Sequence, residues 1–162
     1  MKKITFALLI LTISSCSIFE PKPESEKFYC KINGKAWRPE KATFTSRPPI
    51  TAEWFKNGNF GISAYNVNQN ITIGIKLGMN IPLEIKTYEL QNQASGNNGY
   101  YYYDTSTLPR EQLTSKSGNI KITKIDANSI SGTFEFKTYS DIKKKECNIT
   151  KGQFNNLLFT KY

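Results

Sequence analysis

Apolar and polar residues alternate in short runs from Phe28 to Tyr162, and these runs are rich in Ile, Phe, Tyr and Thr. Asn, Gly or Pro interrupts the runs roughly every eight to twelve residues, as in proteins built from short strands. A period of two places one side chain in the core and the next in solvent, which is the pattern of a half-buried strand. No long segment with helical period occurs here. The pattern predicts an all-β fold, an antiparallel β-sandwich or flattened barrel of about eight to ten strands.

The first hairpin can be placed from its turn. Asn33-Gly34 separates Phe28–Ile32 from Lys35–Trp37, and Asn-Gly supplies the positive φ angles that a two-residue hairpin loop needs. With this loop, Cys30 lies opposite Trp37, and Phe28, Cys30 and Ile32 share one side of the strand. We therefore expect Cys30 to point into the core.

Further strands follow from the same two signals. Asn57-Gly58 predicts a second hairpin with Phe55 opposite Phe60. Strict alternation predicts half-buried strands at 71–77 and 83–90. A third hairpin joins 119–125 to 130–136 through 126–129, and the chain closes with strands at 147–150 and 154–162 on either side of Gly152. The segments 91–99 and 108–117 are expected to be loops.

The N-terminal segment has the pattern of an export signal. Two lysines precede the apolar run 4–13, which as a helix reaches only about 15 Å, half of the ~30 Å that a membrane-spanning helix must cross. A charged end before a short apolar run is typical of a cleaved signal peptide. We expect residues 1–15 to form this signal peptide helix and to be removed.

Ile13-Ser14-Ser15-Cys16 resembles the lipobox of bacterial lipoproteins. The resemblance implies cleavage before Cys16 and acylation of this cysteine, which would anchor the protein in a membrane. The alternative is an ordinary secretory signal, or an uncleaved helix, with an incidental cysteine. Residues 16–27 would be a proline-containing tether and 28–162 a single domain. Because Ser17 and its neighbours are not acidic, sorting rules favour the outer membrane, facing the periplasm, with surface exposure left open.

Composition narrows the chemistry. The chain contains no histidine, which excludes Ser-His and Cys-His catalysis and zinc sites that use histidine. The formal charge of +9 could attract anionic lipid head groups or acidic polysaccharides, whereas an exported lipoprotein is not expected to meet nucleic acid. The basic run 143–145 lies between two predicted strands, so we interpret it as a solvated loop, with a partner-binding role as the alternative.

Cys30 and Cys147 remain as a pair once Cys16 is lipidated. In an oxidising compartment an even pair favours a disulfide, which would join the first strand to the next-to-last one. The alternative is two buried thiols that pack as small apolar groups, since both cysteines alternate in phase with apolar neighbours.

The run Tyr100-Tyr101-Tyr102-Tyr103 is the most unusual motif of the chain. Phenol rings can stack on sugar rings, and their hydroxyl groups form hydrogen bonds, so the run could form a ligand-binding platform. In the simpler alternative the run is an edge strand, with two tyrosines facing the core and two facing solvent.

Paired carboxylates offer the remaining route to catalysis, as in a glycan hydrolase. The available acids are Asp104, Glu111, Asp126, Glu135 and Asp141. Their spacing singles out no pair, and Asp126 stands where a turn prefers Asp. The sequence also has no phosphate-binding glycine loop and no zinc or calcium motif. We therefore expect a protein that is not an enzyme, with neither cofactor nor metal.

Three segments together resemble an uncharacterised Bacteroidetes-type lipoprotein domain family: Phe28-x-Cys30-x-Ile32-Asn33-Gly34-Lys35-x-Trp37, Ile122-Thr123-Lys124-Ile125-Asp126 and Ile130-Ser131-Gly132-Thr133-Phe134-x-Phe136. Gly152-x-Phe154 extends the match. The resemblance implies an all-β envelope lipoprotein of unknown function, and no functional residue can be transferred from it. The leading hypothesis is a lipid-anchored, non-catalytic binding or structural module. The alternatives are a lipocalin-like carrier of a small hydrophobic ligand and a glycan-active enzyme.

Overall fold

The computed structural model of the chain describes residues 27–40, 48–91, 96–103 and 111–162. These residues form strands and turns without a helix, which confirms the predicted all-β class. The strands are β1 (Phe28–Ile32), β2 (Lys35–Trp37), β3 (Ile50–Trp54), β4 (Asn59–Asn66), β5 (Gln69–Lys76), β6 (Thr87–Glu89), β7 (Asn98–Tyr102), β8 (Leu113–Ile125), β9 (Ser129–Ser140), β10 (Lys145–Leu158) and β11 (Thr160–Lys161).

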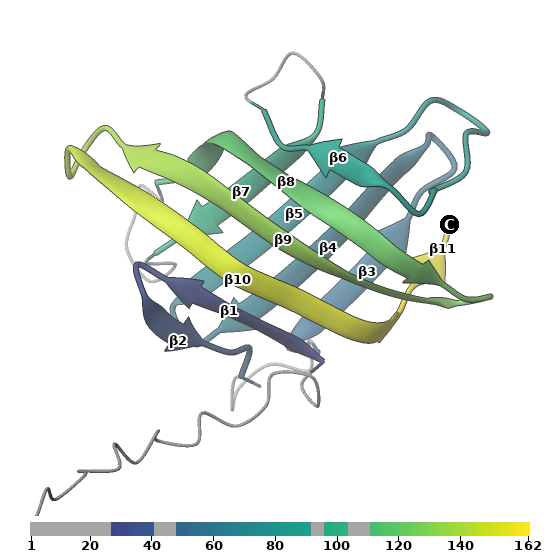
Figure 1. Cartoon of the computed structure of the whole chain (residues 1–162), viewed down its shortest axis with the longest axis horizontal. Helices are drawn as coiled ribbons and strands as arrows, with labels where there is room; N and C mark the ends of the chain where they lie inside the picture. The colour runs from purple at the N-terminus through teal and green to yellow at the C-terminus, as the bar shows by residue number, and fades with distance from the viewer. Residues whose placement is uncertain (1–26, 41–47, 92–95, 104–110) are drawn as a thin grey trace, which may run out of the picture.

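The strands of the described residues belong to one strongly curled sheet, a half-barrel, in the order β11-β3-β4-β5-β7-β8-β9-β10-β1-β2. β6 lies off this path and pairs with β8. In Figure 1, β8, β9, β10 and β1 cross in front of β3, β4 and β5, so the curled sheet forms two layers. The pairing of β11 with β3 is parallel, a feature that the predicted antiparallel architecture did not include.

The core fills the space between the two layers. The alternating isoleucines of β5, at positions 71, 73 and 75, are at most 1% exposed. From the front layer, Phe134 contributes an aromatic ring that contacts Phe28 with ring centroids 5.1 Å apart. Burial of each such side chain stabilises the fold by about 1.5–3 kcal/mol relative to leaving it in water. The interior of the half-barrel is therefore occupied by side chains of the protein itself.

The first hairpin confirms its predicted register. Asn33 and Gly34 have φ angles of 50° and 81°, and Cys30 pairs with Trp37. Phe28, Cys30 and Ile32 all belong to the core. A two-residue loop fixes which residues of the two strands pair, so the local sequence was sufficient to predict the register of this hairpin.

The second hairpin differs from its prediction by one position. Trp54, rather than Phe55, pairs with Phe60, because the loop contains three residues instead of two. The Phe55 carbonyl accepts the Gly58 N–H at 2.9 Å, and the Phe55 N–H donates to the Asn59 carbonyl at 2.8 Å. Gly58, at φ 82°, is the left-handed residue that ends such a three-residue loop. Phe55 consequently lies outside the core, with 38% of its surface exposed.

β8 connects the two layers. Its first residue, Leu113, pairs with Tyr101 of the rear layer, and Asn119–Lys121 pair with β6 of the front layer. The predicted loop at 108–117 was therefore wrong for residues 113–117. Ser115 is fully buried and accepts the Gly99 N–H at 3.0 Å. Because serine counts as polar in a hydropathy pattern, the alternation of buried and exposed residues at the start of β8 could not be recognised from the sequence.

Two other predicted elements change in extent. The strand expected at 83–90 is reduced to Thr87–Glu89, because the Glu84 N–H donates to the Tyr88 hydroxyl at 2.9 Å and closes a turn. Conversely, the interruption expected at Gly152 is absorbed into the continuous strand β10, which has two irregularities in register. Lys151 and Asn156, both with positive φ, lie in these two bulges.

Candidate functional site

The predicted lipid anchor lies outside the described residues. The signal peptide at 1–15, Cys16 and the tether up to residue 26 belong to the part of the chain of which the structure gives no description. In the described ranges, we find no helix with the length and apolar character needed to cross a membrane.

The tyrosine run is not an edge strand. Tyr100–Tyr102 belong to β7, which pairs with β5 on one side and β8 on the other. Tyr101 faces the core and is 4% exposed, and its hydroxyl accepts a hydrogen bond from Gln69 Nε2 at 3.1 Å. Burial, the largest cause, raises the pKa of the Tyr101 hydroxyl. Tyr101 is therefore a core residue.

The other three tyrosines are half-exposed and do not form one platform. Tyr100 and Tyr102 alternate with Tyr101 and share the outer face of the rear layer. The Tyr102 hydroxyl donates to Gln112 Oε1 at 2.6 Å. Tyr103 follows the strand, packs partly against the core and lies beneath Lys143 Nζ, 3.6 Å from its ring centroid. Within the run, only Tyr100 and Tyr102 could therefore contact one ligand together on this face.

Cys30 and Cys147 are both buried and free, so the predicted disulfide is absent from the structure. The strand register gives the reason. Ile32 pairs with Ile149, and the two cysteines lie on opposite sides of this pair, about four residues apart along the strands. At ~3.3 Å per residue, four residues correspond to roughly 13 Å along the strand direction, whereas a disulfide requires Cα atoms within about 7 Å. Burial raises the pKa of both thiols.

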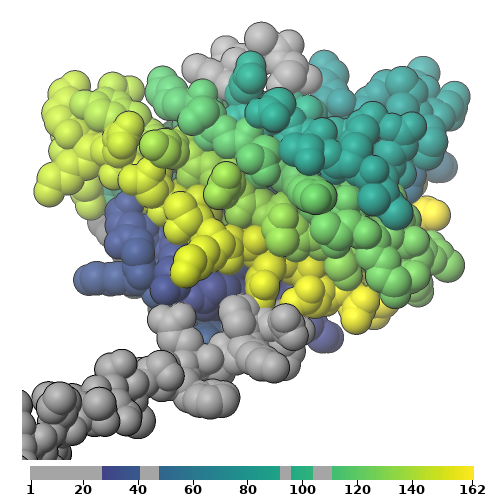
Figure 2. Space-filling view, in the orientation of Figure 1, coloured from purple at the N-terminus to yellow at the C-terminus, as the bar shows by residue number. Residues whose placement is uncertain are grey.

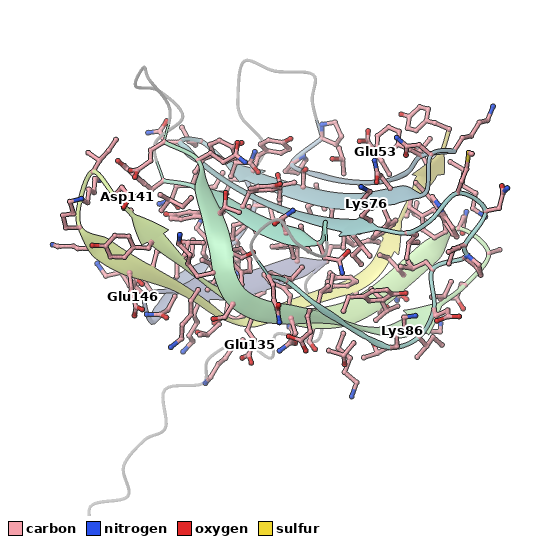
Figure 3. The ribbon with its side chains drawn as sticks, turned by 90° about the horizontal axis from the view of Figure 1, so that it is seen from above. Glu53, Lys76, Lys86, Glu135, Asp141 and Glu146 are labelled. Atoms are coloured by element: carbon pink, nitrogen blue, oxygen red, sulfur yellow. The ribbon has the colours of Figure 1, made fainter. Side chains whose placement is uncertain are left out.

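The acidic residues are dispersed. Glu111 Oε1 and Oε2 accept hydrogen bonds from Ser140 Oγ at 2.9 and 2.8 Å, beside the turn that contains Asp141. Asp126 forms an ion pair with Lys124 at 2.8 Å in the β8–β9 turn. Figure 3 shows Glu135 on the outer side of the front layer, away from Asp141. Asp104 lies outside the described residues, and within the described part no three Cys, Asp or Glu side chains form a group that could hold a metal.

An aromatic cleft at one end of the half-barrel was not predicted. Its first wall is built on the last pairing of the sheet, where Lys161 of β11 lies beside Trp54 of β3. The Tyr162 N–H donates to the Trp54 carbonyl at 2.9 Å. This bond places the Tyr162 ring on that of Phe55, with centroids 5.5 Å apart and an interplanar angle of 16°. The C-terminal residues thus form an aromatic wall.

The second wall is the segment after β5, which contains Met79, Ile81 and Pro82. Gly58 joins the two walls, because its carbonyl accepts the Leu77 N–H at 2.7 Å. A Cβ atom at Gly58 would lie 2.5 Å from the carbonyl oxygens of Leu77 and Gly78, so no larger residue fits. In Figure 2 the yellow C-terminal end emerges at the right edge beneath the teal segments.

The cleft has a volume of about 510 Å³ and is lined by Trp54, Phe55, Lys56, Gly58, Met79, Asn80, Ile81, Pro82, Lys161 and Tyr162. Of the eight large apolar side chains exposed among the described residues, four are found here, at 38–73% exposure. Exposed apolar residues that gather in one concave place indicate a binding surface, whereas scattered ones do not. We call this site the aromatic cleft.

Its only charged lining residues among those described are Lys56 and Lys161. Lys161 Nζ lies 5.4 Å from the centroid of the Trp54 ring, which holds this cation at the rim by a cation–π contact. With cations and no carboxylate in the lining, the cleft favours an apolar group that carries negative charge. The described lining residues include no pair of groups suited to acid–base chemistry.

Sequence reasoning missed this site for two reasons. Its walls come from three segments that only the curled sheet brings together, at 54–58, 79–82 and 161–162. The one-residue error in the second hairpin also assigned Phe55 to a cross-strand pair. The available signal was the occurrence of Met79 and Ile81 in a segment rich in turn residues, where large apolar side chains have no local reason to occur.

The model of one protein family matches residues 25–158. No curated protein and no solved structure matches the chain. The matched region contains every strand from β1 to β10 and most of the aromatic cleft, leaving out the C-terminal wall. The chain therefore belongs to the family described as a domain of unknown function, DUF6252.

Proposed function

We propose that the protein is a lipid-anchored, non-catalytic binding module of the cell envelope, and that it holds an anionic amphiphile in the aromatic cleft. The signal-like residues 1–15 and the lipobox-like Ile13–Cys16 support the anchor. By the same sorting argument, the domain faces the periplasm from the outer membrane. Mass spectrometry of the N-terminal peptide tests the anchor, since acyl groups are expected on Cys16.

The aromatic cleft carries the binding proposal. It combines a concave apolar surface with two cations, which is the usual composition of a small-ligand site. An acyl chain would lie between the Phe55–Tyr162 wall and Ile81, and its anionic head would face Lys56 or Lys161.

The expected affinity is modest. Burial of about six methylene groups stabilises the complex by roughly 5 kcal/mol at ~0.8 kcal/mol each. Lost translational and rotational freedom opposes much of this gain. The full 5 kcal/mol would correspond to a dissociation constant of about 0.2 mM, so after this cost a dissociation constant of about 1 mM or weaker is expected.

A lipocalin-like carrier, which would hold its ligand between the layers, has less support. Phe60, Phe136 and Phe154 occupy that interior and are at most 2% exposed. The filled interior supports binding at the end of the half-barrel, where the lining side chains are exposed.

Calorimetric titration with dodecanoate, below its micellar concentration, tests the proposal. We expect binding to dodecanoate and weaker binding to dodecyltrimethylammonium, which has the same chain and the opposite charge. Phe55→Ser combined with Tyr162→Ser should weaken dodecanoate binding about tenfold, equivalent to ~1.4 kcal/mol. Lys161→Glu should weaken it about threefold, because an exposed ion pair contributes only ~0.5–1 kcal/mol.

Val67→Ser is the matched control, because Val67 is an exposed apolar residue (64%) outside the cleft. It should leave the titration unchanged. Equal binding of the two detergents, or equal losses in the control and the cleft variants, would show that dodecanoate adsorbs without using the cleft.

A further inference from the structure

The outer face of the rear layer carries a row of hydroxyl groups. Thr51 of β3 pairs with Ser63 of β4, Ser63 with Thr72 of β5, Thr72 with Tyr100 of β7, and Tyr100 with Thr114 of β8. All five side chains are half-exposed. Because residues in register across a sheet point to the same face, their hydroxyl groups form one line across five strands.

This row is fixed by hydrogen bonds. Ser63 Oγ and Thr72 Oγ1 lie 3.1 Å apart, and Thr72 Oγ1 donates to Asn70 Oδ1 at 3.3 Å. Asn70 in turn lies between Tyr65 and Tyr102 in the neighbouring row. Three half-exposed tyrosines, at 65, 100 and 102, therefore surround a preorganised set of donors and acceptors.

A pair of glycines opens a strip beside the hydroxyl row. Gly61 pairs with Gly74 in the middle of β4 and β5. A Cβ atom at either position would have no neighbour closer than 3.9 Å, so packing does not require glycine. Glycine inside a strand weakens it and often marks close approach by a ligand. The two glycines thus keep the backbone of this face accessible.

The face also contains few charges, although the whole chain has a net charge of +9. Figure 3 shows Glu53 and Lys76 on this side of the molecule. Glu53 lies beside Gly61 in the register, and Lys76 ends β5, so neither belongs to the hydroxyl row. A protein partner would favour an apolar centre, which this face lacks. Uncharged hydroxyl, amide and phenol groups instead match a neutral sugar chain.

We propose that the outer face of β3, β4, β5 and β7, centred on Tyr100, Tyr102 and the Gly61–Gly74 pair, binds neutral glycans. Pyranose rings would lie on the tyrosine rings, and sugar hydroxyls would exchange hydrogen bonds with the Ser63–Thr72 row. This face is separate from the aromatic cleft and does not share its lining residues.

Affinity electrophoresis in gels that contain dextran, laminarin or arabinogalactan tests this proposal. The full-length chain should be retarded by at least one of these neutral polysaccharides, and the retardation should persist at high salt. Retardation by alginate, an acidic polysaccharide, should disappear with salt, because it would reflect net charge alone. Tyr100→Ser and Gly74→Val should each weaken the neutral retardation about tenfold, whereas both variants should fold, since Gly74 has room for a side chain.

Tyr139→Ser is the matched control, because Tyr139 is a half-exposed tyrosine on β9 of the other layer. It should leave the retardation unchanged. Absence of retardation in all three neutral gels, or an equal loss in Tyr139→Ser, would overturn the proposal. A change in oligomeric state in Tyr100→Ser, measured by light scattering without any glycan effect, would instead assign the face to a second copy of the chain. The Phe55→Ser and Tyr162→Ser variants should retain glycan binding, so the two proposed sites can fail separately.

Discussion

The two buried cysteines show that position in the strand register decides whether a pair can bond. Cys30 lies in β1 opposite Trp37, and Cys147 lies in β10 opposite Thr138. Each thiol is buried, and desolvation raises its pKa, so the reactive thiolate is disfavoured at neutral pH. The even number of cysteines and the expected oxidising compartment favoured a disulfide. Neither of these observations gives the distance between the two cysteines along the strands.

We therefore predict that both thiols are free and protected. Iodoacetamide at neutral pH should leave Cys30 and Cys147 unmodified in the native protein and alkylate both in denaturant without reductant. Peptide mapping distinguishes these sites from Cys16. If their alkylation in denaturant needed prior reduction, the two cysteines would be bridged and the register would have to change.

At the scale of the elements, the glycines of the two layers have different physical roles. Gly132 of β9 faces the core, where a Cβ atom would lie 2.3 Å from the Lys121 carbonyl oxygen and 2.6 Å from the Phe154 ring. Gly61 of β4 meets no such obstacle. Gly132 allows close approach of neighbouring strands, whereas Gly61 leaves an outer surface open.

This difference predicts opposite effects of the same substitution. Gly132→Ala should lower the free energy of unfolding by about 1–3 kcal/mol through overpacking. Gly61→Ala should raise it by about 0.5–1 kcal/mol, because alanine loses less conformational entropy on folding. Urea denaturation followed by circular dichroism measures both. Equal destabilisation by the two variants would contradict the assigned roles and would also remove the glycine argument for a ligand on the outer face.

The hairpins mark the limit of local sequence information. Asn33-Gly34 and Asn57-Gly58 look alike, yet the first forms a two-residue loop and the second ends a three-residue loop. Gly58 also packs against the Leu77–Gly78 backbone, a contact with a segment remote in sequence that the first hairpin's loop does not share. Alternation was sufficient to predict strands such as 71–77, but not their extension into segments with buried serine, such as Ser115.

At the scale of the whole molecule, the all-β class could be predicted, whereas both proposed binding surfaces depend on how the sheet curls. The tyrosine run was a correct starting point for the outer face, but its partners Ser63 and Thr72 come from other strands. The aromatic cleft exists because the end of the chain returns from β10 to pair with β3. Such contacts between distant segments leave no periodic signal in the sequence.

Phe159 holds this return in place. It lies between β10 and β11, is 7% exposed, and contacts the rings of Trp54 and Phe60 with centroids 6.1 and 6.2 Å away. Its N–H donates to the Asn128 carbonyl in the front layer at 2.9 Å. Through these contacts one residue connects the β8–β9 turn of the front layer to β3 and β4 of the rear layer.

Phe159→Ala should therefore lower the free energy of unfolding by about 3–5 kcal/mol, as expected when a buried phenylalanine is truncated. Tyr162→Ala is the control, because Tyr162 is 56% exposed and should change stability by no more than about 0.5 kcal/mol. Urea denaturation measures the stability of both variants. Dodecanoate titration is then carried out under conditions in which each variant is folded. Phe159→Ala should also weaken dodecanoate binding, since Lys161 and Tyr162 would lose their position beside Trp54. If Phe159→Ala were as stable as the unaltered protein, the assigned role of this ring would be wrong. The backbone pairing of β11 with β3 would then be sufficient to hold the two layers together.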